Sequence, residues 1–109
     1  MMDEGVFRKH CDAAMENLKK KLIAAEDVAD IEVEDQGGAL HVSFDDGSKF
    51  IISPNGAARQ IWISALSTSF KLDWQESEQG FVMAKSGEGL SPLVARLINE
   101  KLGEAAVTL

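Results

Sequence analysis

The sequence has a single cysteine and no long apolar run, and both absences limit what the protein can be. Cys11 is the only cysteine among 109 residues, which excludes an intramolecular disulfide and a metal cluster built from several thiolates. No apolar run approaches the roughly 20 residues that a membrane-spanning helix needs. Asp3 and Glu4 stand where a signal peptide has basic and apolar residues. We therefore expect a cytoplasmic protein of a reducing compartment, without a membrane partner.

Basic residues are also scarce, and one stretch has none. Eighteen acidic residues against eleven lysines and arginines leave a net charge of −7, which argues against nucleic acid as a partner. Residues 1–46 contain twelve acids and five bases, whereas residues 47–109 contain six of each. From Glu26 to Asp46 there are eight acids and no lysine or arginine. This uneven charge indicates a strongly acidic surface on one part of the fold.

The composition and the first apolar pattern predict one globular domain, residues 1–109, that begins with a helix. The hydrophobic fraction of 45% and the charged fraction of 27% are typical of a globular chain. Apolar residues then recur at steps of three and four, the spacing of one helical face. They are Phe7, Cys11, Ala14, Leu18, Leu22 and Ala25. We expect a helix over residues 4–25, capped by Asp3.

The middle of the chain changes to a period of two, which is typical of strands. Six segments show it or are bounded by turn residues. We expect strands over residues 29–35, 39–44, 49–53, 59–64, 69–74 and 81–85. Asp46-Gly47 is a strong hairpin signal between the second and third segments, and Pro54 is expected to end the third.

A second amphipathic helix follows the strands. Ser91 is its expected N-cap, Pro92 its first-turn proline and Gly103 its left-handed C-cap. Two helices are too few to cover both faces of a sheet of five or six strands. We therefore expect an α+β fold, a two-layer sandwich with both helices on one face of an antiparallel sheet and the other face in water.

Trp62 is the residue that this one-sided arrangement makes most informative. In the stretch from Gln60 to Ser64, Ile61 and Ile63 share one strand face while Trp62 lies on the other. If the isoleucines face the helices, Trp62 lies on the open face, as an interaction residue would. The alternative is a shift of one residue in the register, which would bury Trp62 in the core.

These features together resemble the frataxin family, in particular its bacterial members, over roughly residues 4–103. The most specific motif is the stretch 59–64 (RQIWIS), followed by Leu72-Asp73-Trp74 and later by Gly87 before the last helix. Weaker motifs are the acidic strand 30–34, the Gly37-Gly38 turn and the segment 46–49. No glycine-rich phosphate loop and no nucleophile motif points to an enzyme.

The resemblance implies a monomeric, non-enzymatic accessory protein of iron–sulfur cluster assembly. Frataxins bind ferrous and ferric iron weakly through carboxylates, and they dock on the complex of cysteine desulfurase with its scaffold protein, as iron donors or regulators. By this resemblance the expected iron ligands are Glu26, Asp27, Asp30, Glu32 and Glu34. The expected partner contacts are Asn55, Gln60, Trp62 and Lys71.

The sequence departs from the family pattern at two places. Lys19, Lys20 and Lys21 stand near the end of the first helix, where relatives usually carry more acids. Ser53-Pro54-Asn55 replaces the Asn-x-Gln pattern of the strand before Trp62. The lysines leave one alternative open, in which the acids form only a solvated face and the protein is an interaction regulator without meaningful iron binding. A separate alternative is that the protein oxidises and stores iron.

Overall fold

The computed structural model describes residues 3–109, which form two helices and six strands. The order along the chain is helix, six strands, helix. The elements are α1 (Glu4–Ala25), β1 (Ile31–Gln36), β2 (Ala39–Phe44), β3 (Lys49–Asn55), β4 (Gln60–Ala65), β5 (Thr68–Gln75), β6 (Gly80–Val82) and α2 (Leu90–Leu102). Within residues 3–109, neither helix combines the length and the hydropathy that are needed to cross a bilayer.

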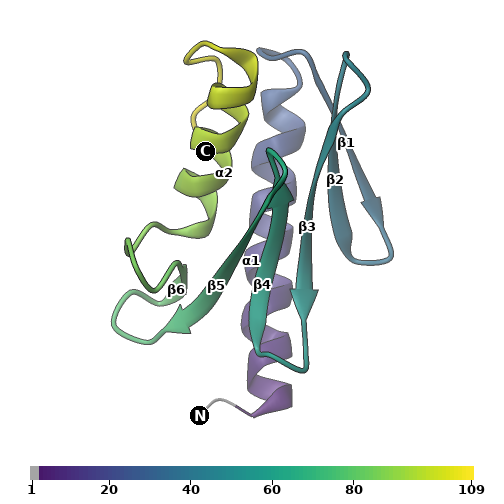
Figure 1. Ribbon diagram of the computed structural model, residues 1–109. Coiled ribbons are helices and arrows are strands. Elements are labelled where there is room, and N and C mark those ends of the chain that lie inside the picture. The colour runs from purple at the N-terminus through teal and green to yellow at the C-terminus, as the bar shows by residue number, and fades with distance from the viewer. Residues whose placement is uncertain (1–2) are drawn as a thin grey trace.

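All six strands form one antiparallel sheet in the order of the sequence, from β1 to β6. Figure 1 shows α1 and α2 side by side against the same face of this sheet. The side chains on that face are apolar and buried, among them Val42, Ile52, Ile61 and Leu72, each 0% exposed. The predicted two-layer α+β fold with one open sheet face is therefore confirmed.

Helix α1 has the predicted bounds and cap. The Asp3 carboxylate accepts a hydrogen bond from the backbone N–H of Val6 at 2.8 Å, which satisfies a free donor of the first turn. The buried face contains Met15 in addition to the predicted residues, whereas Ala14 lies at its half-buried border. This difference has a simple cause: the flexible Met15 side chain reaches the core from the next position on the helix.

Besides the end of β3, two strand boundaries differ from the prediction by two residues or more. Residues 29 and 30 belong to the turn after α1, where the backbone N–H groups of Val28 and Ala29 donate to the carbonyl of Ala25, so β1 begins at Ile31. At the other end of the sheet, β6 ends at Val82, because the backbone of Met83 is engaged by Gly87 and Glu88 in the next turn.

Pro54 does not end β3, contrary to the prediction. The strand continues to Asn55, and Pro54 pairs with Ile61 of β4. On its other side β3 pairs with β2 only up to Ile52. The missing N–H of a proline costs no ladder hydrogen bond where no neighbouring strand is present, so an edge position tolerates it.

The start of α2 also differs from the prediction, whereas its end agrees. The N-cap is Gly89, without a side-chain hydrogen bond, and Ser91 lies inside the helix, where its hydroxyl is 3.5 Å from the ammonium of Lys21. Gly103 ends the helix with a positive φ of 74°, a conformation that glycine adopts without strain.

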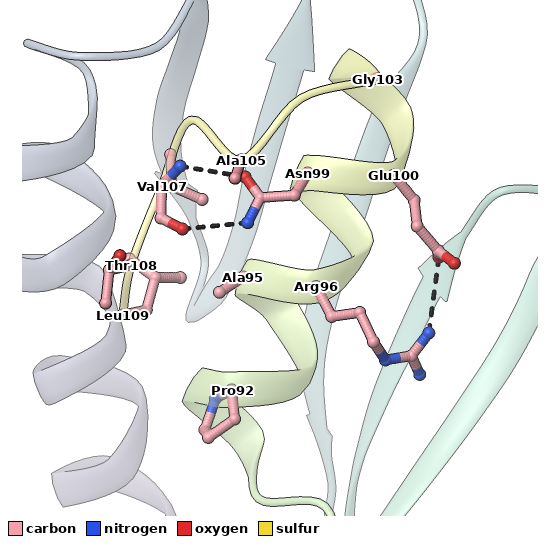
Figure 2. Close-up of a pocket in the computed structure, with 10 residues that line it drawn as sticks. All are labelled: Pro92, Ala95, Arg96, Asn99, Glu100, Gly103, Ala105, Val107, Thr108 and Leu109. Atoms are coloured by element: carbon pink, nitrogen blue, oxygen red, sulfur yellow. Dashed lines mark hydrogen bonds and ion pairs between the residues drawn. The ribbon is translucent and has the colours of Figure 1, made fainter.

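After Gly103 the chain turns back along α2. The side-chain oxygen of Asn99 accepts hydrogen bonds from the backbone N–H groups of Ala106 and Val107, and its amide nitrogen donates to the carbonyl of Val107. Figure 2 shows Asn99 pointing at this tail, beside a groove of about 690 Å³. Val107 is 5% exposed, so the tail adds to the core.

Candidate functional site

The open face of β4 and β5 carries a square of four polar and aromatic side chains. Gln60 pairs with Asp73 across the two strands, and Trp62 pairs with Lys71. Because residues two apart on a strand share a face, all four point away from the helices. Trp62 is 37% exposed, in agreement with the prediction that it lies on the wet face rather than in the core.

These four side chains contact one another. The indole Nε1–H of Trp62 donates to the Oε1 atom of Gln60 at 2.8 Å, and the Nε2 atom of Gln60 donates to Oδ1 of Asp73 at 3.0 Å. The ammonium of Lys71 lies 4.9 Å from the centre of the Trp62 ring, within the range of a cation–π contact. Trp62 is therefore held in place on an otherwise solvated surface.

Asn55, the fourth expected partner contact, lies next to this square but is engaged in the chain's own turn. It pairs with Gln60 in the register of β3 and β4. Its side-chain oxygen accepts a hydrogen bond from the backbone N–H of Ala58 at 2.8 Å. An amide has one acceptor oxygen and two N–H donors, so this turn uses the oxygen of Asn55 and not its donors.

The expected iron ligands do not form one cluster. The carboxylate of Glu26 accepts a hydrogen bond from the backbone N–H of Val33 at 2.8 Å, so it covers the free edge of β1. Asp27 is an exposed residue of the turn after α1. Glu32 and Glu34 are exposed on the open face of β1, about 7 Å apart along the strand. Glu34 also accepts from the amide of Gln36 at 2.7 Å.

Asp30 lies outside β1 and contacts a different acid. Its carboxyl is next to Asp45, and repulsion between the two charges, together with a hydrogen bond between the two carboxyls, raises the pKa of Asp30. Asp35, which the sequence did not single out as a site residue, faces the helices and forms an ion pair with Lys19 at 3.3 Å. The hydrogen bond from the Gly38 backbone, followed by Lys19, lowers the pKa of Asp35.

The donor set suits weak metal contacts rather than a chelating centre. Between residues 3 and 109, no three histidine, cysteine, aspartate or glutamate side chains are grouped so that they could hold a metal ion. Carboxylate oxygens are suitable ligands for hard or borderline cations. Glu32 and Glu34 can thus contact iron from an exposed strand, whereas Glu26 already accepts the Val33 N–H through one of its two oxygens.

Two further reactive side chains, Cys11 and His10, are engaged in packing. Cys11 is 2% exposed, and burial, followed by the charge of Asp12, raises the pKa of its thiol to about 11. His10 stacks on Trp74 with ring centres 3.8 Å apart. The indole N–H of Trp74 donates to Glu76 at 2.7 Å. A protonated, buried thiol is a poor nucleophile, so Cys11 belongs to the core.

Asp73 is the member of the square that the sequence analysis did not identify as a site residue. The signal that could have found it is the hairpin register: strands that turn between Ala65 and Thr68 place Asp73 directly opposite Gln60. Asp45 was missed because it approaches Asp30 only through the pairing of Ile31 with Phe44.

Comparison with known proteins gives a consistent result. The sequence profile of the frataxin-like domain matches residues 1–104. The chain is 35% identical over 104 residues to "Iron-sulfur cluster assembly protein CyaY" of Stutzerimonas stutzeri, with 95% of this chain and 93% of that protein covered. The protein of the same name from Azotobacter vinelandii is 30% identical over 103 residues, with 94% and 92% covered.

A solved structure supports the same assignment at the level of the fold. Frataxin from Psychromonas ingrahamii superposes with a TM-score of 0.82 at 20% sequence identity, and the match covers 98% of this chain and 97% of that one. The profile match spans nearly the whole sequence, and the relatives align over more than nine-tenths of their length. The chain therefore belongs to the frataxin family.

Proposed function

We propose that this protein is a cytoplasmic accessory protein of iron–sulfur cluster assembly and not an enzyme. The similarity to proteins named for iron–sulfur cluster assembly supports this role, because those relatives align over most of both chains. Within this role the protein uses two surfaces. The open face around Trp62 binds a protein partner, and the acidic stretch of β1 contacts iron.

The observation that carries the proposal is the position of Trp62. A large aromatic side chain 37% exposed on a sheet, held by Gln60 and Lys71, contributes little to the core. A partner that covers the indole removes apolar area from water without having to order the side chain first. The proposed partner is the complex of cysteine desulfurase with the iron–sulfur scaffold protein, which Asn55 contacts at the end of β3.

A binding experiment tests this surface. The protein is immobilised and exposed to the cysteine desulfurase and scaffold protein of the same organism, with and without ferrous iron, under anaerobic conditions. We expect capture of the complex, and weaker capture by Trp62→Ala. Equal capture by the parent protein and Trp62→Ala would contradict the docking role of the open face.

The proposed iron surface consists of Glu32 and Glu34, with Glu26, Asp27 and Asp30 beside them. Two carboxylates about 7 Å apart repel each other, and a cation between or beside them relieves this repulsion. Binding is weak because each carboxylate supplies few ligand atoms and stays in contact with water. The acids also offer a counter-charge to a basic partner, so Glu32→Lys combined with Glu34→Lys should weaken its binding in a salt-dependent way.

A second candidate is an interaction regulator of the same fold with little or no iron binding. The observation that favours it is the use of Glu26 by the Val33 backbone and of Asp35 by Lys19. An anaerobic titration with ferrous iron separates the two candidate functions. Its readout is the NMR chemical shifts of Glu26, Asp30, Glu32 and Glu34. Shifts at submillimolar iron support the iron-binding role, whereas no shift at millimolar iron leaves the regulator.

Ferroxidase activity with iron storage is a third alternative, carried over from the family resemblance. It requires iron oxidation that is faster than in buffer and a protein that assembles into oligomers as iron is added. The oxidation rate under air and the size of the protein in solution test both requirements. A monomer that leaves the rate of iron oxidation unchanged removes this alternative.

A further inference from the structure

The hydrogen bonds of the open face form a chain with a fixed direction. Trp62 is at one end and its indole N–H can only donate, while Asp73 is at the other end and its carboxylate can only accept. Gln60 lies between them and has one group of each kind. The order in which Gln60 presents these groups therefore decides whether the indole finds an acceptor.

Asp73 selects the orientation of the Gln60 amide. The carboxylate attracts the NH₂ end of the amide at 3.0 Å, which turns the carbonyl oxygen toward Trp62. With the amide reversed, two oxygens would face each other at Asp73 and two donors would face each other at Trp62. Both contacts are unfavourable, so the negative charge of Asp73 stabilises a single arrangement of the three side chains.

We propose that Asp73 is a positioning residue for partner recognition: it orients Gln60, and Gln60 orients the Trp62 indole for contact with the partner. This inference rests on the proposed docking function. In this arrangement the indole N–H is already occupied, so the partner is recognised through the ring surface and the ammonium of Lys71 rather than through a hydrogen bond from the indole.

The backbone supports this geometry. Gln60 and Asp73 are paired residues of one antiparallel ladder, as are Trp62 and Lys71, and the hairpin that joins their strands closes between Ala65 and Thr68. Gln60 and Asp73 are both half-buried, and the hydrogen bond between them is partly shielded from water. The chain of contacts is thus built on two adjacent strands and does not depend on a mobile loop.

The test uses the two tryptophans of the chain as reporter and control. Each has its own indole N–H acceptor, Gln60 for Trp62 and Glu76 for Trp74. The variants are Asp73→Ala, the conservative Asp73→Asn, which keeps an acceptor oxygen, and Glu76→Ala as the matched control. The measurements are the chemical shift and the solvent-exchange rate of each indole N–H in ¹H–¹⁵N spectra, and the affinity for the desulfurase–scaffold complex.

We expect Asp73→Ala to accelerate exchange of the Trp62 indole N–H about five- to tenfold, the factor that corresponds to one hydrogen bond, and to weaken partner binding by a similar factor. Asp73→Asn should stay within about twofold of the parent in both measurements. Glu76→Ala should change the indole signal of Trp74 and leave that of Trp62 unchanged. If Asp73→Ala does not fold, Gln60→Ala removes the acceptor directly and should give the same two effects.

Unchanged exchange of the Trp62 indole in Asp73→Ala would overturn the positioning role. Faster exchange with unchanged affinity, while Trp62→Ala binds more weakly, would also overturn it, because the orientation of the indole would then not matter to the partner. A third outcome is faster exchange in Asp73→Ala while Asp73→Ala and Trp62→Ala both bind the complex as tightly as the parent protein. It would support the orientation of Trp62 by Asp73 and overturn the docking function of this face.

Discussion

The carboxylate of Glu26, just after α1, accepts a hydrogen bond from the backbone N–H of Val33 on β1, with 2.8 Å between Oε2 and N. β1 is a strand at the edge of the sheet, and among residues 3–109 no strand lies beside its outward N–H groups. The first residue of the expected iron ligands is therefore also a cover for a sheet edge. The two roles therefore fall on one carboxylate, of which the Val33 N–H uses one oxygen.

Glu26→Ala should expose the Val33 N–H without unfolding the protein. We expect faster hydrogen exchange of that amide and a loss of less than about 1 kcal/mol in the free energy of unfolding, because the bond is exposed to solvent. Iron-induced NMR shifts at Glu32 and Glu34 should persist. Glu26→Gln, which keeps an acceptor oxygen, is the control and should leave the exchange rate nearly unchanged.

Trp62→Ala and Trp74→Ala should have opposite consequences. Trp62 lies on the open face, so we expect a change of less than about 1 kcal/mol in stability and a loss of at least about tenfold in affinity for the desulfurase–scaffold complex. Trp74 packs between His10 and Phe81 at the edge of the core, and its loss should cost about 2–3 kcal/mol. Urea unfolding and a binding titration measure both effects. Strong destabilisation by Trp62→Ala would mean that the indole is part of the core.

The turn between β4 and β5 should be open to stabilisation. Leu66 and Ser67 form this two-residue loop with φ angles of 52° and 61°, a region that favours asparagine and glycine. Replacing the pair by Asn-Gly should raise the free energy of unfolding by about 1 kcal/mol, because the strain disappears while the register is kept. Leu66→Ala is the control: it shortens the exposed side chain but keeps the Cβ atom, so thermal unfolding should show no comparable gain.

Asn99→Ala should release the C-terminal segment from α2. Three hydrogen bonds between Asn99 and the backbone of Ala106 and Val107 would be lost, and we expect a cost of about 2 kcal/mol in urea unfolding. Asn99→Asp keeps the acceptor for the two N–H groups and should lose less. Equal stability of all three proteins would show that the hydrogen bonds of Asn99 to the tail, drawn in Figure 2, do not stabilise the fold.

The pair of Asp30 and Asp45 should make stability fall as the pH rises. The charge of Asp45 raises the pKa of Asp30 above its ordinary value of 3.8, so Asp30 binds its proton more tightly in the folded state. A raised pKa stabilises the fold below the unfolded value, and this contribution is lost as the pH rises through the folded value. Asp45→Asn should bring the NMR titration of Asp30 back toward 3.8 and remove this loss.

The contribution of Asp46 to stability should have the opposite pH dependence, so Asp46 serves as the control for Asp30. The ammonium of Lys101 at 2.5 Å, followed by Ser48, holds the pKa of the Asp46 carboxyl well below its usual range. Its stabilising effect is present above the unfolded pKa and is lost as the pH falls. Lys101→Met should therefore weaken stability at neutral pH more than at acidic pH, and the difference should shrink in high salt.

The predicted elements were correct where one side of an element is apolar. The isoleucines on either side of Trp62 and the apolar stripe of α1 depend only on periodicity, and both lie in the core as predicted. The wrong predictions came from local sequence rules whose outcome depends on the adjacent elements of the structure. Pro54 is accepted in β3 because β2 does not extend alongside it, and Ser91 does not cap α2 because the chain enters the helix at Gly89.

For the candidate site, too, the sequence predicted the strand face on which a residue lies but not the contacts between strands. Alternation along one strand is enough to place Trp62, Gln60, Glu32 and Glu34 on the open face. It cannot identify Asp73 as the acceptor for Gln60, because that contact joins two strands and depends on where the hairpin closes. For the same reason the acidic stretch predicted a charged surface but not the separate partners of its members.

The sequence alone determined the order of the elements, the side of the sheet that the helices cover and the sign of the charge near β1. These follow from apolar periodicity and from composition, which are properties of neighbouring residues in the chain. Only the tertiary structure decided that Glu26 covers Val33, that Asp30 meets Asp45 and that Asp73 orients the Gln60–Trp62 pair. Each of these contacts joins different elements, so strand register and helix packing decide which side chains meet.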